Sequence, residues 1–363
     1  MAVERLDRRT HILAYNPTMR RPKYSVSQQI ESLKSHGVTF NLYTEADAQE
    51  FLTSRTYFFK LKAFENNFER DNGRYRGLDF AYLADLSTID CHLRTLLSYL
   101  CLNLEHALKV RFNQLIMEDA NEDGYNIVHN FDEAGEFSFH GDYANSRYHH
   151  SNYTEGLLNK YFEDPSIWNL WEVIDFSTLC KLYKAYLNQR SYKDNATNLF
   201  QSIRIMRNAS SHNNCLMIGI EKQIKPTLYV KNCVKELNHG ENPKQLFDAF
   251  RTYPLTHDFA ATICGFLILV DSPGVRNTAK LKTQDFLHRL TKRYDYSAMS
   301  YQDCPKLIET INALQSICKM AIDYFDQHPE DFRTNKILHT RPEPISPAKG
   351  RAQINHMAKA MGL

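Results

Sequence analysis

The residues best suited to chemistry lie in one short segment. The string IRIMRNASSHNN places Arg207, Asn208 and His212 in a row of the form R-N-x-x-x-H. An arginine fork binds a phosphodiester and stabilises the charge that develops in the transition state. A histidine titrates near neutral pH, so it can exchange protons with an attacking 2′-hydroxyl or a leaving 5′-oxygen. The segment therefore predicts cleavage of RNA without a metal or other cofactor, with Arg207, His212 and Asn208 as catalytic residues.

The spacing limits how one helix can present this pair. On an ideal helix, residues five positions apart point about 140° away from each other. Arg207 and His212 then meet one phosphate only if the helix ends or distorts between them, or if a second subunit completes the site. Ser210 and Ser211 are poor helix formers, which favours a local break at that point.

The elements that position this segment are predicted to be helices, because helical spacing dominates and no strand alternation recurs with hairpin turns. Ser25 and Gln28 have capping-box spacing, with Gly37 as a stop, and Thr44 begins a second helix. The strongest stripe runs over about 78–117, and we expect the spine of a bundle rather than a bent helix. Its leucines and isoleucine are Leu83, Leu86, Ile89, Leu93, Leu97, Leu100, Leu104, Leu108 and Leu115.

Further helices follow from caps and apolar spacing. Asp164 as a cap before Pro165 predicts a helix over 166–174, and Asp175 or Ser177 begins another through Tyr183. The fold class is therefore all-α. The remaining predicted helices cover about 196–206, 243–252, 256–271 and 302–327.

Composition excludes several classes of protein. The chain has 363 residues, of which 43% are hydrophobic, so it can build a core and is not globally disordered. The mean hydropathy is −0.50, and the longest apolar run, 259–270, is too short to span a bilayer. The N-terminus lacks a secretion signal, so we expect a cytoplasmic protein without a membrane partner. Eight cysteines without a C-x-x-C pair predict small core residues rather than zinc or disulfide frameworks.

Charge is distributed unevenly. Residues 118–164 hold eleven acidic residues against Arg147 and Lys160, although the whole chain carries +2. Residues 1–23 and 331–363 each hold six basic residues and two acidic ones. These basic ends favour a polyanionic partner, with Arg20, Arg21 and Lys23 as RNA-binding residues; the alternative is a pair of merely solvated tails.

The acidic stretch is also rich in histidine. It interrupts the helical pattern over about 118–155, which predicts an insert. The histidines lack the ligand spacing of a zinc site, so we favour a surface loop over a zinc enzyme. They are His129, His140, His149 and His150.

Four strings resemble, in order, the successive signatures of the Abi family of bacterial abortive-infection proteins, which belongs to the HEPN superfamily. The most specific is W-x-x-x-E-V-x-x-F-x-T-L-x-K-L-Y over 168–183. The others are YSVSQQIESLKSHG, LEHALKVRF and MRNASSH. The resemblance implies a HEPN-type helical bundle over 23–220 that contains the insert. The remaining predicted domains are a basic arm over 1–22, additional helices over 221–330 and a basic, proline-containing tail over 331–363.

The resemblance also implies chemistry. HEPN domains carry an R-x4–6-H ribonuclease motif, which maps onto Arg207, Asn208 and His212. Glu105 falls on the family's acidic helix position, where it either holds Arg207 or is an ordinary surface acid. The implied activity is a phage-defence endoribonuclease that uses the 2′-hydroxyl of its substrate, forms a homodimer and binds a small structured RNA.

A different class of function stays open. The family usually follows the motif with a second His, an Arg and a Trp, whereas this chain continues with Asn213, Asn214, Cys215 and Leu216. This difference supports the alternative of an RNA-binding or scaffold HEPN protein that does not cut RNA.

Overall fold

The computed structural model describes residues 23–133, 151–161, 163–291, 301, 304–328 and 341–345. Helices dominate this part of the chain, and its strands form only two short antiparallel pairs. The all-α prediction is confirmed. The arm over 1–22, which includes Arg20 and Arg21, lies outside the described residues, as does most of the tail over 331–363.

The N-terminal elements begin where their caps predict. Ser25 accepts a hydrogen bond from the Gln28 amide while the Gln28 side chain accepts one from the Ser25 amide. Thr44 and Asp47 form the same reciprocal pair at the second helix. The elements are α1 (Val26–Ser35), α2 (Glu45–Ser54), α3 (Phe58–Lys62), the 3-10 helix η2 (Ala63–Asn67), β1 (Arg70–Asp71) and β2 (Arg74–Tyr75).

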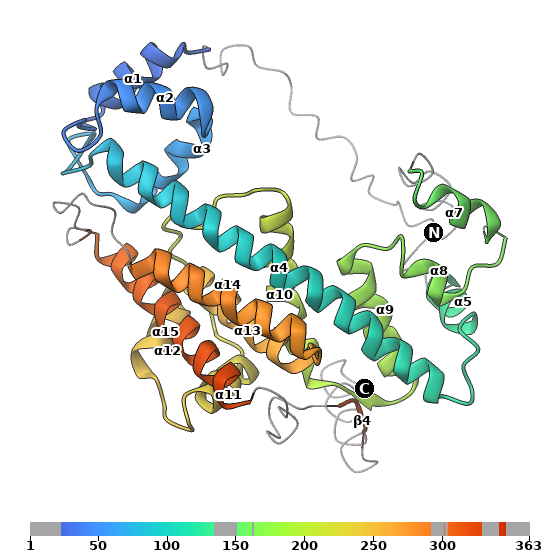
Figure 1. Ribbon diagram of the computed structural model, residues 1–363. Coiled ribbons are helices and arrows are strands. Elements are labelled where there is room, and N and C mark those ends of the chain that lie inside the picture. The colour runs from blue at the N-terminus through green and yellow to red at the C-terminus, as the bar shows by residue number, and fades with distance from the viewer. Residues whose placement is uncertain are drawn as a thin grey trace, which may run out of the picture.

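The predicted spine is a single helix, α4 (Phe80–Glu118), of 39 residues. It crosses the molecule from the cluster of α1, α2 and α3 to the elements that follow it at the far end (Figure 1). Its N-cap is Asp79, which accepts hydrogen bonds from the Ala81 amide and the Thr39 hydroxyl. The structure therefore bears out the spine.

The region after α4 departs from the prediction in two places. Part of the acidic insert is helical, because Ile127, Val128 and Phe131 bury one face. The predicted helix over 166–174 shrinks to about one turn, and its cap is Ser166 rather than Asp164: the Ser166 amide and hydroxyl donate to Asn169. The elements are α5 (Asn126–Glu133), α7 (Glu155–Lys160), α8 (Ile167–Leu170) and α9 (Phe176–Gln189), which Asp175 caps as predicted.

The helix predicted over about 196–206 is two elements, and the second is longer than predicted. They are the 3-10 helix η4 (Asn195–Asn198) and α10 (Phe200–Ser211), and the strand β3 (Tyr192–Lys193) precedes them. The helices predicted after Pro226 are present, together with α11 and α14. Their bounds are α11 (Leu228–Leu237), α12 (Lys244–Thr252), α13 (Pro254–Leu269), α14 (Pro273–Thr291) and α15 (Pro305–Gln327), and β4 (Glu343–Pro344) pairs with β3.

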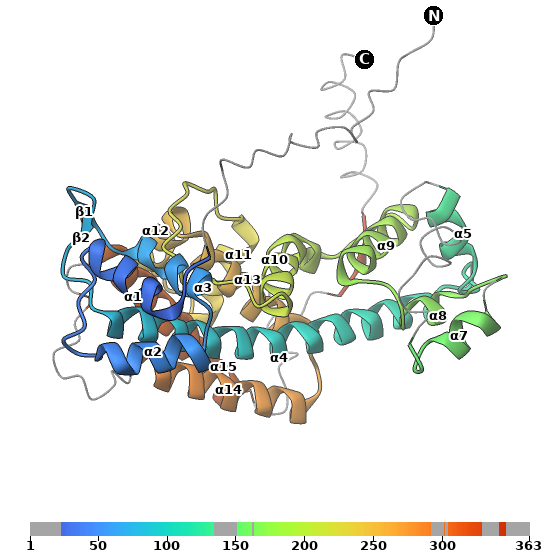
Figure 2. The same cartoon turned by 90° about the horizontal axis from the view of Figure 1, so that it is seen from above.

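One core joins the early and late helices. The apolar run over 259–270 forms most of α13 and is buried as predicted, packed against α4, α10 and α15. Gly265 permits the close approach of α10, because a Cβ there would lie 2.7 Å from the Ile203 side chain. Figure 2 shows α9, α10, α11 and α12 on one side of α4, with α14 on the other. The helix that carries the motif is thus fixed on two others.

Candidate functional site

The motif occupies the last turn of α10. Phe200, Ile203 and Met206 are buried against the core, which fixes the rotation of the helix. Arg207 is then half-buried beside α4, whereas Asn208 is exposed to solvent. His212, at the end of the helix, is also exposed. Of the three predicted catalytic residues, Arg207 is therefore the one that is partly buried.

The end of α10 lies at Ser211, the second of the two serines where a break was expected. The helix continues through Ser211, and the Ser210 hydroxyl donates to the Arg207 carbonyl at 3.0 Å instead of interrupting the turn. His212 is the C-cap, and Asn213 takes a left-handed conformation with φ of 59°. The Asn213 and Asn214 amides donate to the carbonyls of Ser210 and Ala209 at 3.2 and 2.9 Å, a Schellman motif.

This geometry narrows how the pair can act. Because the backbone from Arg207 to Ser211 is helical, the two side chains leave the axis about 140° apart. α10 shows no break between Arg207 and Ser211, and it ends at Ser211, one residue before His212. A site completed by a second subunit stays a prediction.

Glu105 lies where the sequence could not decide its role. Its carboxylate is 3.5 Å from Arg207 Nη2 and 3.5 Å from Lys109 Nζ, so two cations share one acid. The Glu105 side chain is 15% exposed and that of Arg207 is 27% exposed. Lys109 also donates to the Trp171 carbonyl at 2.5 Å. Of the two readings, the geometry matches the one in which Glu105 holds Arg207.

The ion pair between Arg207 and Glu105 does not satisfy all polar atoms of the two side chains. Arg207 Nε and Glu105 Oε2 are both buried, and neither has a hydrogen-bond partner among the described residues. A buried donor without a partner is costly, so the contact between the two side chains is not optimal. Arg207 is thus positioned by charge while part of its donor capacity stays unused.

Two thiols lie close to this pair but are not suited to nucleophilic attack. Burial raises the pKa of Cys101, beside Arg207 and Glu105, to about 12. Burial likewise raises the pKa of Cys180 to about 12. Because the thiolate is the reactive form, both cysteines are neutral and unreactive near pH 7.

The segment after the motif is tied to the N-terminal part of α4. Asp90 accepts hydrogen bonds from the Leu216 and Met217 amides at 2.6 and 2.9 Å, and from Arg94 Nε at 2.8 Å. The Asp90 side chain is fully buried. The sequence analysis missed this anchor, although a carboxylate within an apolar stripe, four residues before an arginine, was a usable signal.

A second anchor comes from α3. Lys60 Nζ donates to the Asn213 carbonyl at 2.9 Å, at the residue that ends the helix. Burial, together with the nearby Arg94, lowers the pKa of Lys60. Both anchors hold the backbone on the C-terminal side of His212, while the His212 side chain itself stays exposed.

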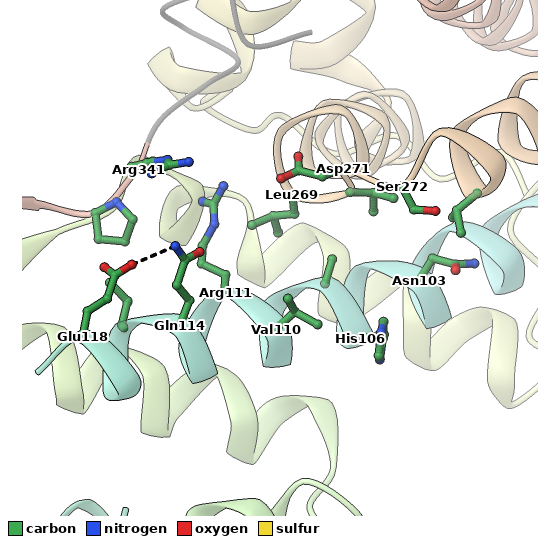
Figure 3. Close-up of a pocket in the computed structure, with 15 residues that line it drawn as sticks. Asn103, His106, Val110, Arg111, Gln114, Glu118, Leu269, Asp271, Ser272 and Arg341 are labelled. Atoms are coloured by element: carbon green, nitrogen blue, oxygen red, sulfur yellow. Dashed lines mark hydrogen bonds between the residues drawn. The ribbon is translucent and has the colours of Figure 1, made fainter. Parts of the chain in front are cut away.

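A hollow on α4 is separate from the motif. It encloses about 280 Å³ between α4, the turn from α13 to α14, and the segment over 341–345, which contributes Arg341 (Figure 3). Its lining residues on α4 lie about 80° or more around the helix from Glu105, by the helical repeat of about 100° per residue. Arg111 in its wall donates to Asp194 at 3.1 Å and to the Ile268 carbonyl at 3.2 Å. This hollow therefore adds nothing to the Arg207 site.

The structure describes two of the remaining predicted residues, Lys23 and His129. Lys23 is exposed at the start of the described chain. His129 lies 3.2 Å from Asp164, with both side chains exposed, and the other three histidines of the insert are outside the described residues. No three His, Cys, Asp or Glu side chains in the described ranges are grouped so that they could hold a metal ion. Within the same ranges, every helix is too short or too polar to cross a membrane.

Comparison with known proteins identifies the region that contains the motif. Residues 50–217 match the family model described as Abi-like protein. No curated protein and no solved structure matches the chain. The matched range lies inside the predicted 23–220 and contains Glu105, Arg207, Asn208 and His212. The region that carries the motif is therefore similar to the Abi-like protein family.

Proposed function

We propose that this chain is an abortive-infection protein whose motif cuts RNA without a metal. The match to the Abi-like family model points to abortive infection, a form of phage defence. The observation that carries the ribonuclease proposal is the state of Arg207: Glu105 holds its guanidinium at 3.5 Å, while 27% of the side chain stays exposed. Such an arginine is pre-positioned for an anionic oxygen.

The step needs no external reagent. The 2′-hydroxyl of the substrate gives its proton to the imidazole of His212 and attacks the adjacent phosphorus. The bond from phosphorus to the 5′-oxygen breaks, and that oxygen takes up the proton that the His212 imidazole accepted. The products are a cyclic phosphate and a 5′-hydroxyl end. Arg207 neutralises the charge on the phosphoryl oxygens as the new bond forms.

In this proposal a homodimer brings an Arg207 and a His212 side chain close together. Since α10 directs Arg207 and His212 about 140° apart, the proposal places Arg207 of one protomer and His212 of its partner on the same phosphate. A bound small RNA is part of the same proposal, with the basic ends of the chain as its contacts.

The alternative is an RNA-binding or scaffold protein that does not cut. Its support was the replacement of the second histidine by Asn213. In the fold, Asn213 is the left-handed residue that ends α10, a position that asparagine occupies readily. This replacement therefore has a structural use and is a weaker argument against catalysis.

The decisive experiment incubates labelled single-stranded RNA with purified protein in EDTA. We expect cleavage by the wild type, and a loss of about 10²–10⁴-fold in rate for Arg207→Ala and for His212→Ala. Melting temperatures measured in parallel separate catalytic loss from unfolding. RNA binding without any cleavage supports the alternative, and a folded His212→Ala protein that cuts at the wild-type rate contradicts the assignment of this motif.

A further inference from the structure

A second cationic site lies between α11 and α12, outside the matched family region. It is a groove of about 460 Å³ whose lining includes Lys231 and Lys235 from α11 and Lys244 and Arg251 from α12. The only acidic residue in this lining is Asp248, which forms an ion pair with Arg251. The groove therefore presents more positive charge than its own residues neutralise.

Three ammonium groups carry this excess. Among the residues that the structure describes, no acid lies within ion-pair distance of Lys231, Lys235 or Lys244. Lys231 lies over the Phe247 ring, 5.4 Å from its centroid, which holds its ammonium at the groove. Unpaired lysines grouped around a hollow attract an anion with several charges.

The loop that leaves the motif extends this surface. The Lys222 amide donates to the Thr252 carbonyl and the Ile224 amide to the Arg251 carbonyl, both at 2.9 Å. These bonds fix the loop against the end of α12, with the side chains of Lys222 and Lys225 exposed. Lys222 and Lys225 thus add positive charge beside the groove.

A series of hydrogen-bonded polar groups fixes the position of the groove relative to α10. Ser202 on α10 donates to Asp258 at 2.6 Å, and Asp258 lies 3.1 Å from His257 Nδ1, both on α13. The Thr227 amide, at the N-terminus of α11, donates to His257 Nε2 at 3.3 Å. The helix that bears the motif and the first wall of the groove are therefore linked through α13.

We propose that the groove between α11 and α12 binds the phosphate backbone of a single-stranded RNA. Its unpaired ammonium groups and the amides of Asn232 and Asn242 are donors suited to phosphate oxygens. The helices that line the groove, α11 and α12, lie on the same side of α4 as α10 (Figure 2), so we infer that one strand can contact both sites. The choice of RNA over an acidic protein segment rests on the proposed function, which brings RNA to α10.

The test measures binding separately from cleavage. The probe is a labelled single-stranded 2′-O-methyl RNA of about 20 nucleotides, which retains its phosphates but lacks the attacking hydroxyl. The full-length variant Lys231→Gln/Lys235→Gln/Lys244→Gln is compared with the wild type between about 50 and 200 mM salt. The matched control, Lys160→Gln/Lys193→Gln/Lys282→Gln, removes the same charge elsewhere.

We expect Kd to rise about tenfold for the groove variant, with a salt slope shallower by about 2, because each phosphate contact on a single strand contributes about 0.7. The control triple should bind like the wild type. If the groove variant fails to fold, the double variant Lys235→Gln/Lys244→Gln keeps the Lys231–Phe247 contact. It should reduce the salt slope by about 1.4.

Wild-type Kd and salt slope in the groove variant overturn the proposal. Tight binding of polyglutamate through these lysines, with no binding of the RNA, overturns it in favour of an acidic protein partner. If the wild type binds the methylated RNA through the groove but does not cut ordinary RNA, the groove stands and the proposed ribonuclease fails.

Discussion

Two acidic residues on α4, Asp90 and Glu105, contact the segment that carries the motif, yet their surroundings differ. They are fifteen residues apart, about four helical turns, and both point toward the side of α10. Asp90 is fully buried and accepts three short hydrogen bonds, from one side chain and two amides. Glu105 is partly exposed, and its two cationic partners lie at 3.5 Å.

The difference separates structural support from availability for binding. A buried carboxylate with both oxygens hydrogen-bonded is costly to remove and is not accessible to a ligand. The Glu105 pair keeps Arg207 in place while leaving donors and acceptors unused. The same helix thus fixes the backbone after His212 at one end and presents Arg207 for binding at the other.

The largest effect on stability is expected at Asp90. Asp90→Ala leaves Arg94 and two amides without their acceptor, so we expect a loss of about 3–5 kcal/mol in the free energy of unfolding. Chemical denaturation measures it, and Glu105→Ala is the matched control, with an expected loss below about 1.5 kcal/mol. Equal losses at the two positions would erase the contrast between them.

The next largest effect is expected when Arg207 and Arg94 are each replaced by lysine. Arg207→Lys keeps the charge but not the fork, so we expect RNA cleavage to fall about 10²-fold at an unchanged melting temperature. Arg94→Lys makes the same change in the structural pair, and should lower stability while the folded protein retains its cleavage rate. Assays of cleavage and melting on both variants check this, and a melting loss for Arg207→Lys equal to that of Arg94→Lys would contradict it.

A smaller effect is expected when Glu105 becomes neutral. Glu105→Gln keeps the shape of the side chain but releases Arg207 from charge pairing, so kcat should fall about tenfold with KM nearly unchanged. Glu105→Asp should retain more of the rate, because a carboxylate is still present. Single-turnover kinetics provide the measurement, and a change confined to melting temperature would make Glu105 purely structural.

The smallest effect concerns the end of α10. Asn213→Ala places a Cβ-bearing residue without a polar side chain at φ of 59°, and should cost about 1 kcal/mol of stability. Asn213→Gly should cost less, since glycine adopts this conformation freely. Thermal denaturation of the two variants ranks them, and the reverse order would show that the cap does not set this position.

Local signals in the sequence were sufficient for much of the fold. The capping pairs at Ser25 and Thr44, the cap at Asp175 and the leucine stripe of α4 each act within a few residues, and the structure confirms them. The R-N-x-x-x-H row also identified the candidate site without any fold. At Ser210 and Ser211 packing outweighed short-range preference: burial of Met206 and Ala209 keeps the last turn helical, and α10 ends only after Ser211.

Contacts between distant residues were decided only by the tertiary structure. Asp90 bonds to an amide 126 positions later, and Glu105 pairs with Arg207 from another helix. Neither partner is encoded in a local pattern, because the pairing depends on how α10 and α13 pack against α4. By itself the sequence determined the helices, the motif and the excess of charge; the packing of those helices decided which acid supports the fold and which one holds Arg207 in a position to bind.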